Sequence, residues 1–274
     1  MSCEKIRFLD NNLLGQEYVI LTGTDDYEGN SPADVLDPYN FGIYRLTEHP
    51  TLGGYCFDVE LSASLEPSSF AVIPSDVRKF YLTSETEVVI QASNFGFESV
   101  EKEFKGKFSQ YGVFCNIRQA ETDNAYRYWR IWIKEFSRAP DDINESLDIK
   151  YLYFGDHVEI NDTNISNGIG VKWVDNSTIA KSQSGRRYPN YKKPTLELNN
   201  CRFGLLKGND RRNFQRFYQR VGKTENFLVV PDPSDFISVD PYELMRVMHF
   251  SQVPSQSHVV FDMYDQSFTL VEAV

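Results

Sequence analysis

The pattern of hydrophobic and polar positions divides the chain into a strand-rich first part and a mixed second part. In residues 1–160, short runs of alternating apolar and polar side chains are separated by clusters of Gly, Pro, Asn and Asp. Such runs with turn residues between them predict a β-sandwich. Helix is scarce here, and residues 76–82 form at most one turn. The expected strands are 17–23, 53–63, 69–74, 80–84, 86–94, 111–120, 125–136 and 147–160.

Residues 125–136, AYRYWRIWIKEF, combine aromatic, β-branched and cationic side chains. A period of two places Trp129 and Ile131 on one face and Tyr128 and Arg130 on the other. Alternating β-branched and aromatic residues indicate a strand. Because both faces carry bulky groups, we expect one face on a core and the other against a second layer or a partner. Tyr, Trp and Arg are also favoured in binding surfaces, so a ligand platform is the alternative.

The second part begins after an Asn- and Gly-rich stretch, residues 159–170, which has little to bury. We therefore expect a β-sandwich over residues 1–160 and a smaller α+β domain over residues 161–274. In the second domain, residues 181–193 predict a basic arm or long loop, and 194–203 and 226–230 predict strands. Residues 231–236 predict a loop, and 257–274 predict a hairpin with its turn at 265–266.

One clear helix is expected at residues 209–222, NDRRNFQRFYQRVG. Asn209 and Asp210 supply a cap signal at its start, and Gly222 supplies a stop signal. The residues at i, i+3, i+4 and i+7 form one apolar stripe, which predicts packing on a core. These are Phe214, Phe217, Tyr218 and Val221.

The composition is that of a globular, β-rich protein, with 41% hydrophobic residues, 20 Phe and 16 Tyr against 4 Met. The N-terminal residues lack the apolar segment of a signal peptide, and no stretch approaches the roughly 18 apolar residues of a membrane span. The four cysteines are far apart and form no C-x-x-C pair. We therefore expect a soluble protein with free thiols, made in a reducing cytoplasm.

Charge is unevenly distributed along the chain. Residues 181–223 hold twelve Lys and Arg against two acids, Glu197 and Asp210; of the 28 bases and 39 acids in all, this leaves 16 bases and 37 acids elsewhere. The basic segment interleaves cations with Tyr188 and Tyr191, a pattern that can also stack on single-stranded nucleic acid. An acidic body would repel a phosphate backbone. We therefore favour protein contact over nucleic acid, with the basic segment on the acidic surface of a neighbouring copy or partner.

No motif in the sequence predicts catalysis. The chain has no H-E-x-x-H, G-x-S-x-G, Walker or G-x-G-x-x-G segment, and its four histidines lie singly. A glycosidase could hide two carboxylates, because its catalytic pair is defined in space and not in sequence. A glycosidase is therefore only a third hypothesis, and we expect no enzyme activity.

Residues 24–34, TDDYEGNSPAD, offer hard oxygen donors for calcium at Asp25, Asp26, Glu28 and Asn30. Their spacing lacks the regular positions of an EF-hand loop. An ordinary acidic turn is therefore the favoured interpretation, and we expect no metal and no cofactor.

The order of landmarks in the first part resembles the discoidin-like, galactose-binding-type jelly rolls. These domains have a segment with Ala followed by Leu-Asp, an aromatic–Asp–Val–x–Leu strand, a strand that begins with Val and ends with Ser, and a late Arg-Tyr-x-Arg-Ile strand. The resemblance implies that residues 125–136 are the late central strand, whose aromatics and Arg130 hold the core and its rim together. The matching positions are Ala33, Leu36, Asp37, Phe57, Asp58, Val59, Leu61, Val89, Gln91, Ser93, Arg127, Tyr128, Arg130 and Ile131.

The whole chain resembles baseplate or distal tail-tip proteins of long-tailed bacteriophages, which have no catalytic motif. The matching residues are Ser182, Gly185 and Tyr188, the basic helix, and the loop Pro231, Asp232 and Pro233. The resemblance implies a virion structural protein that forms a homo-oligomeric ring and contacts other tail proteins. The candidate assembly contacts are Arg186, Arg187, Lys192, Lys193, Arg211, Arg212, Arg216 and Arg220.

The alternative function is a carbohydrate-binding module that recognises cell-surface glycan, such as that of a host. Aromatic and polar residues fall in one predicted loop region, where they could contact sugar or instead fill the end of the sandwich. The candidate glycan contacts are Tyr27, Tyr39, Tyr44 and Arg45.

Overall fold

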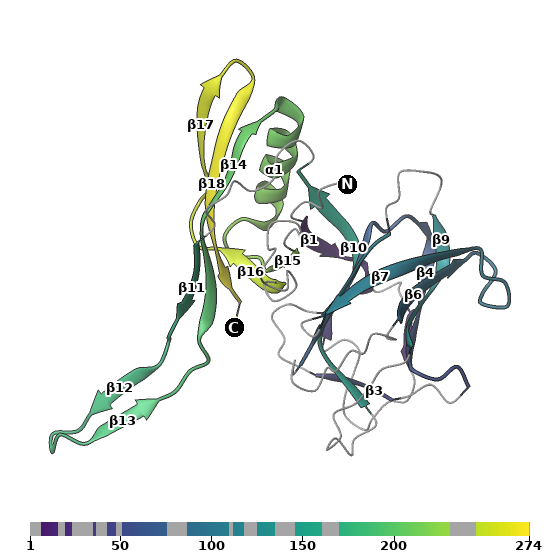
Figure 1. The fold of residues 1–274 in the computed structure, drawn as a ribbon, viewed down its shortest axis with the longest axis horizontal. Helices are drawn as coiled ribbons and strands as arrows, with labels where there is room; N and C mark the ends of the chain where they lie inside the picture. The colour runs from purple at the N-terminus through teal and green to yellow at the C-terminus, as the bar shows by residue number, and fades with distance from the viewer. Residues whose placement is uncertain are drawn as a thin grey trace. The chain divides into compact units, whose positions relative to one another are not determined.

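A computed structural model describes residues 7–15, 20–23, 35–36, 43–47, 51–75, 87–109, 112–117, 125–134, 146–160, 170–230 and 245–273. The protein is mainly β, with one α-helix among the described residues (Figure 1). Contacts divide the chain into two compact units, which are described separately. Unit 1 consists mainly of residues 7–157, and unit 2 of residues 158–229 and 246–274. The domain boundary at residue 160 stays a prediction.

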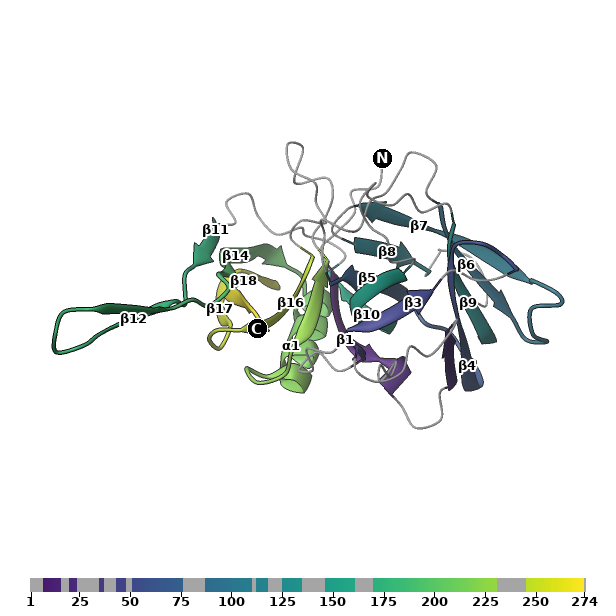
Figure 2. The same cartoon turned by 90° about the horizontal axis from the view of Figure 1, so that it is seen from below.

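Unit 1 is a sandwich of antiparallel strands, which confirms the predicted fold class (Figure 2). The strand order is β1-β10-β5-β8-β7-β6-β9-β4-β2, with β3 also paired to β10. Strand β7 pairs with β8 on one side and β6 on the other, so it links the two layers. The strands are β1 (Arg7–Asn12), β2 (Ile20–Gly23), β3 (Tyr44–Thr47), β4 (Tyr55–Leu65), β5 (Ser69–Pro74), β6 (Glu87–Ser93), β7 (Lys102–Ser109), β8 (Gly112–Asn116), β9 (Tyr126–Lys134) and β10 (Ser146–Glu159).

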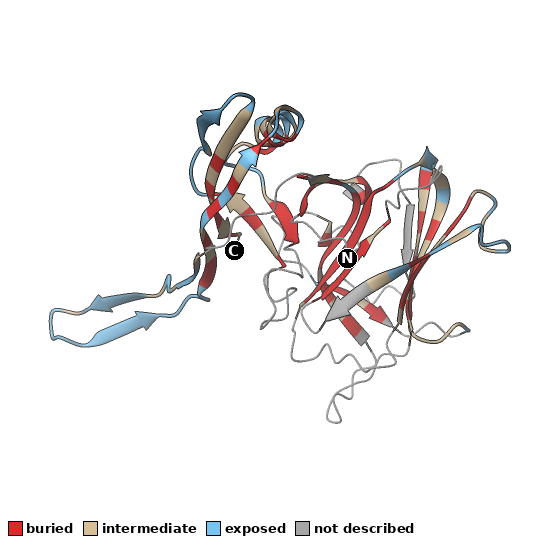
Figure 3. Cartoon of the chain, turned by 45° about the horizontal axis from the view of Figure 1, so that its top comes forward, coloured by how far each residue is buried: buried red, intermediate tan, exposed pale blue. Residues whose placement is uncertain are grey.

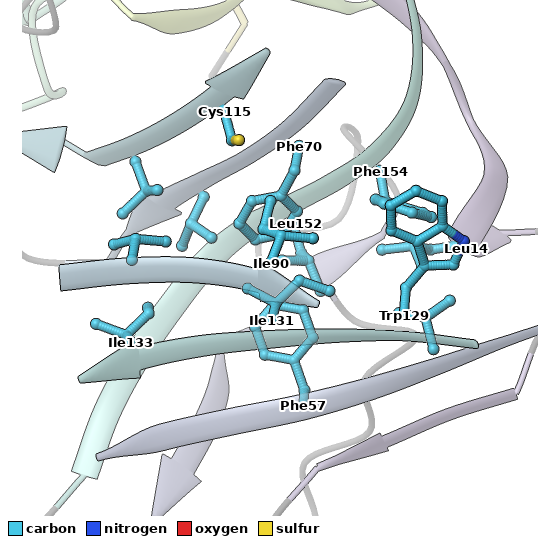
Figure 4. Packing of buried hydrophobic residues seen from close by; sticks show 14 of the residues in the cluster. Leu14, Phe57, Phe70, Ile90, Cys115, Trp129, Ile131, Ile133, Leu152 and Phe154 are labelled. Atoms are coloured by element: carbon cyan, nitrogen blue, oxygen red, sulfur yellow. The ribbon is translucent and has the colours of Figure 1, made fainter. Parts of the chain in front are cut away.

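The core of unit 1 lies between the two layers and is built around aromatic side chains (Figure 4). The Trp129 ring of β9 meets the Phe154 ring of β10, with centroids 5.3 Å apart. Phe57 of β4 and Phe70 of β5 pack at 5.7 Å. Aromatic pairs at such distances add to the stabilisation from burial alone. These contacts therefore join one layer to the other.

Strand β9 shows the alternation expected for residues 125–136. Trp129, Ile131 and Ile133 are buried in the core, whereas Arg130 and Trp132 are half-buried on the opposite face. The strand pairs with β4 on one side and β6 on the other, so it is central in its layer. The prediction of a central strand with one face on the core is confirmed.

The sequence pattern does not predict three of the described strands of unit 1, namely β1, β3 and β7. Strand β7, KEFKGKFS, does alternate, but its lysines and glycine weaken the apolar pattern. Strand β3 has only four residues, and the sequence predicts a loop there. Strand β3 is held in place by pairing with β10, which is distant in the sequence, whereas β7 pairs with its sequence neighbours β6 and β8. The predicted strand at 80–84 and the single helical turn at 76–82 lie outside the described residues.

Unit 2 combines an antiparallel sheet with one helix. The strand order is β11-β14-β18-β16-β15, and β17 pairs with β18. Strands β12 and β13 form a separate two-stranded sheet. The elements are β11 (Gly170–Val174), β12 (Thr178–Lys181), β13 (Arg187–Asn190), β14 (Thr195–Leu206), α1 (Gly208–Val221), β15 (Phe227–Val230), β16 (Arg246–Phe250), β17 (Ser255–Val260) and β18 (Met263–Glu272).

Helix α1 packs on this sheet through the predicted apolar stripe. Phe214 contacts Phe203 of β14 and Phe268 of β18, at 5.6 and 5.3 Å between ring centroids. Phe217 contacts Phe227 and Phe250 at 5.0 and 5.9 Å. Periodicity in the sequence therefore identified the buried face of the helix correctly.

The helix ends where predicted but begins earlier. Gly222 has a φ of 57°, and its N–H donates to the carbonyl of Tyr218, as a helix-ending glycine should. The predicted cap at Asn209 and Asp210 is wrong, because the N-cap residue is Lys207, which makes no side-chain cap hydrogen bond. Asp210 lies within the first turn, where a carboxylate is favoured by the helix dipole.

The terminal hairpin is also displaced from its predicted register. Its turn is at Phe261–Asp262, because Val260 pairs with Met263, and not at residues 265–266. Asp262 has a φ of 54°, which Asp tolerates better than most residues. Gln266 is buried within β18, and its amide donates to the carbonyl of Ser255 at 2.8 Å. Cross-strand bonding therefore sets the turn position.

Candidate binding surfaces

An exposed aromatic ring marks the first candidate surface, on unit 1. Phe95 is the second residue after the end of β6, and its side chain is 80% exposed. The Phe95 N–H donates to the hydroxyl of Ser93 at 3.1 Å. Gly96 has a φ of 85°, which allows the chain to turn sharply after the ring. The backbone therefore holds a large apolar ring in solvent.

Asn94, beside Phe95, is the centre of a hydrogen-bond network. Its side-chain oxygen accepts from the hydroxyl of Ser64 at 2.8 Å and from the N–H of Arg127 at 3.1 Å. Its backbone N–H donates to the carboxylate of Glu101. Asn94 therefore fixes the turn after β6 against the end of β4 and the start of β9.

Charged and aromatic groups continue this surface along β9. The Arg127 guanidinium donates to Glu60 at 2.6 Å and lies 5.3 Å from the centre of the Tyr128 ring. We call this set the Phe95 surface: Glu60, Ser64, Asn94, Phe95, Glu101, Arg127 and Tyr128. An aromatic ring beside several fixed polar groups is suited to a ligand with both apolar faces and hydroxyl groups.

The sequence does not predict Phe95 as a contact residue, because the pattern of residues 86–94 predicts a strand that ends before it. A signal was present in the order Ser-Asn-Phe-Gly at residues 93–96, which places an aromatic residue inside a turn. Exposure of the ring could not be read from that order. It depends on the network of Asn94, whose partners are distant in sequence.

The described residues that the sequence predicts for glycan contact, Tyr44 and Arg45, are not part of the Phe95 surface. Tyr44 belongs to β3 and is only 1% exposed, so its ring fills the core and does not face solvent. Arg45 donates to both carboxylate oxygens of Asp148, at 2.7 and 3.0 Å, across the pairing of β3 with β10. Tyr27 and Tyr39 lie outside the described residues. The structure therefore does not join Tyr44 and Arg45 into a solvent-facing pocket.

The second candidate surface is the segment that joins β11 to β14 in unit 2, residues 175–193, which we call the arm. It is a β-hairpin of β12 and β13, and both strands are exposed along their whole length (Figure 3). Arg186, Arg187, Lys192 and Lys193 are all exposed on it. Tyr191 is 83% exposed. The arm therefore presents cations and apolar side chains together.

The helix contributes a second group of cations. Arg212, Arg216 and Arg220 recur every four residues along α1 and are exposed, so they lie on one side of it. Arg211 differs, because its guanidinium lies 4.2 Å from the centre of the Tyr264 ring. Its side chain therefore packs against β18 and is less available to a partner than the other three.

Groups that could support chemistry are dispersed in the described parts of the chain. No group of three His, Cys, Asp or Glu side chains is close enough there to hold a metal ion. Ser69 and His157 do form a hydrogen bond of 2.6 Å, but both are buried in the sandwich. Asp25 and Asp26, the candidate calcium ligands, lie outside the described residues.

The described cysteines are free and buried. Burial raises the pKa of the Cys56, Cys115 and Cys201 thiols to about 12. A thiol with such a pKa is protonated at neutral pH and is a poor nucleophile. No described helix is long and apolar enough to cross a membrane.

No protein-family model matches the chain. No curated protein sequence matches it either. Several solved structures from Clostridium perfringens match part of it. CpGH89 in complex with GlcNAc-alpha-1,4-galactose matches 50% of this chain at 18% identity and a TM-score of 0.34, but this chain covers 14% of that one.

Two further matches are nearly complete for the other chain. The family 32 carbohydrate-binding module from C. perfringens NanJ, in complex with galactose, covers 54% of this chain and 98% of its own, at 13% identity and a TM-score of 0.36. CpGH89CBM32-5, in complex with GalNAc-beta-1,3-galactose, covers 50% and 93%, at 14% identity and a TM-score of 0.35. Likeness at this level assigns no role to any residue of this chain.

Proposed function

We propose that the chain is a non-enzymatic binding protein whose sandwich, unit 1, recognises a cell-surface carbohydrate through the Phe95 surface. The observation that supports this is the 80% exposed ring of Phe95 beside the hydrogen-bond network of Asn94. An apolar face of a sugar ring can lie on an aromatic ring, while its hydroxyl groups bond to fixed polar side chains. Both elements are present within one turn and the strands beside it.

A glycan array followed by calorimetry tests this proposal with three proteins. The wild type should retain a defined group of glycans, and Phe95→Ala should bind them at least about tenfold more weakly. Phe261→Ala is the matched control, because Phe261 is an exposed Phe of unit 2. Its affinity should equal that of the wild type.

Two other results would contradict the proposal. If the wild type binds no glycan, the proposal that the chain recognises carbohydrate is contradicted. If the wild type and Phe95→Ala bind equally well, the Phe95 surface is not the site, and the segment containing Tyr27 and Tyr39 becomes the next candidate.

A second candidate function is supported by a different observation, the exposed arm with its cations. We propose that unit 2 assembles the chain with further copies and partner proteins, as a structural component of a bacteriophage tail tip or baseplate. The ring would be held by contact between the basic segment and acidic surfaces, since the remainder of the chain has 37 acids against 16 bases. Unit 1 would then face other tail proteins or the host.

Light scattering at low and high salt tests this assembly. We expect a mass that is a multiple of 31.7 kDa at low salt and falls at high salt, because salt screens exposed charges. Arg212→Glu with Arg216→Glu should lower the mass and leave the monomer folded. Arg211 is not a suitable target, because it packs on Tyr264. A salt-independent monomer would contradict assembly by this chain alone.

A further inference from the structure

The arm contains a like-charge pair that is directly opposed. In the register of β12 and β13, Lys181 pairs with Arg187, and Ile179 pairs with Pro189. Directly opposed residues project from the same side of a two-stranded sheet, with Cβ atoms about 5 Å apart. One side of the arm therefore carries two adjacent cations beside two apolar side chains.

Nothing in the described parts of the chain neutralises this pair. Neither Lys181 nor Arg187 has a carboxylate partner among the described residues, and both are exposed. Like charges directly opposite one another destabilise a strand pair. A single two-stranded hairpin is also marginally stable in water. An anionic partner that binds beside the two cations would therefore stabilise the hairpin.

Local bonds at the tip show that the hairpin has a defined turn despite this repulsion. Ser182 N–H donates to the carbonyl of Arg186, and Gly185 N–H donates to the carbonyl of Ser182, both at 2.9 Å. At the base, Lys192 N–H donates to the hydroxyl of Ser177 at 3.0 Å. The two cations are thus held opposite each other by bonds at both ends of the arm.

We infer that this side of the arm is a docking site for a carboxylate-bearing surface on a second copy of the chain, so that one carboxylate group lies between Lys181 and Arg187. This inference rests on the assembly proposal and names the contact. Charge complementarity selects the partner, because residues outside 181–223 carry 21 more acids than bases. Ile179 and Pro189 supply apolar area beside the ion contact.

Arg187→Glu tests the inference because it should stabilise the arm and at the same time weaken assembly. The introduced carboxylate would face Lys181 and form an ion pair within the hairpin. Amide hydrogen exchange of the arm in the dilute monomer should therefore become slower. Association measured by sedimentation over a concentration series at low salt should become about tenfold weaker, because the cation pair is lost. Lys181→Glu should repeat both effects.

Lys223→Glu is the matched control, since it makes the same charge change at an exposed position beyond α1. It should leave arm exchange unchanged and should weaken association less than Arg187→Glu. If the wild type associates and Arg187→Glu associates equally well, the arm contact is overturned while assembly stands. If Arg187→Glu associates more strongly, the cations protect the arm edges from pairing, and the inference is again overturned. A wild type that stays monomeric at every concentration overturns both this inference and self-assembly.

Discussion

Arg130 of β9 and Asp58 of β4 face each other on adjacent strands, and two contacts of 2.8 Å join the guanidinium to both carboxylate oxygens. The guanidinium also lies 4.1 Å from the centre of the Phe97 ring. Hydrogen bonding to Asp58 raises the pKa of Arg130 above its usual value. Both side chains are half-buried, so this pair fastens two central strands on the face opposite the core.

Replacing one member of this pair should cost measurable stability. Asp58→Asn keeps the shape of the side chain but removes the charge that holds Arg130. We expect the free energy of unfolding in urea to fall by about 1–3 kcal/mol. Glu66→Gln, at an exposed position, should change it by less than about 0.5 kcal/mol. Equal effects of the two substitutions would show that the ion pair contributes nothing.

Two tryptophans in different surroundings should differ strongly. Trp129 is fully buried between the layers of unit 1, so Trp129→Ala should lower the free energy of unfolding by about 3–5 kcal/mol. Trp173 of β11 is 55% exposed, and Trp173→Ala should change it by about 0.5 kcal/mol or less. Chemical denaturation of each variant measures the difference. A small loss at Trp129 would contradict the described core.

Gly54 and Gly96 both have positive φ, but replacing each with Ala should lower the stability of the fold by different amounts. A Cβ added to Gly54 would lie 2.3 Å from the carbonyl oxygen of Ile133, whereas one added to Gly96 would meet nothing within 4 Å. Gly96→Ala should cost only the backbone strain, about 1 kcal/mol. Gly54→Ala should cost more than about 2 kcal/mol, because β4 must move away from β9. Thermal unfolding of the two variants should rank them in this order.

The buried thiols should resist alkylation in the folded protein. With a pKa of about 12, roughly one thiol in ten thousand is ionised at pH 8, and burial also restricts access. Iodoacetamide labelling read by mass spectrometry should therefore modify Cys56, Cys115 and Cys201 only after denaturant is added. Rapid labelling of any of these three without denaturant would contradict its burial.

The same thiols affect stability at high pH. Their pKa is raised from 9.0 to about 12 by folding, so the folded state favours the protonated thiol. Their contribution is complete below about pH 9 and is lost as the pH rises from 9 towards 12. Cys115→Ala should reduce the loss of stability over that range, as measured by urea unfolding at several pH values. An unchanged pH dependence would contradict a raised pKa at Cys115.

His249 should make the fold sensitive to acid. Burial lowers its pKa below the usual 6.5, so the folded state favours the neutral ring. Its contribution is therefore present above about pH 6.5 and is lost as the pH falls through the lowered value. His249→Gln should flatten the pH dependence of stability, measured by urea unfolding between about pH 7 and 5. Identical profiles for wild type and His249→Gln would contradict the prediction.

Much of the fold could be predicted because its elements have strong local patterns. Alternation in residues 125–136 identified the central strand, and the spacing of Phe214 and Phe217 identified the buried face of α1. Strand β7 and the turn at Phe261–Asp262 were missed or displaced, since their positions depend on pairing with other strands. The same limit applied to Phe95, whose exposure depends on contacts of Asn94 with β4 and β9.

Composition, short periods and residue counts are enough to predict the β-rich character, the sandwich class, the described helix α1 and the segregation of charge. Only the folding of the chain in three dimensions establishes that Tyr44 is part of the core, that Arg45 forms an ion pair with Asp148, and that Phe95 faces solvent. It also decided that Lys181 stands opposite Arg187. These relationships join residues through strand register and long-range hydrogen bonds, and neither is fixed by the order of nearby residues.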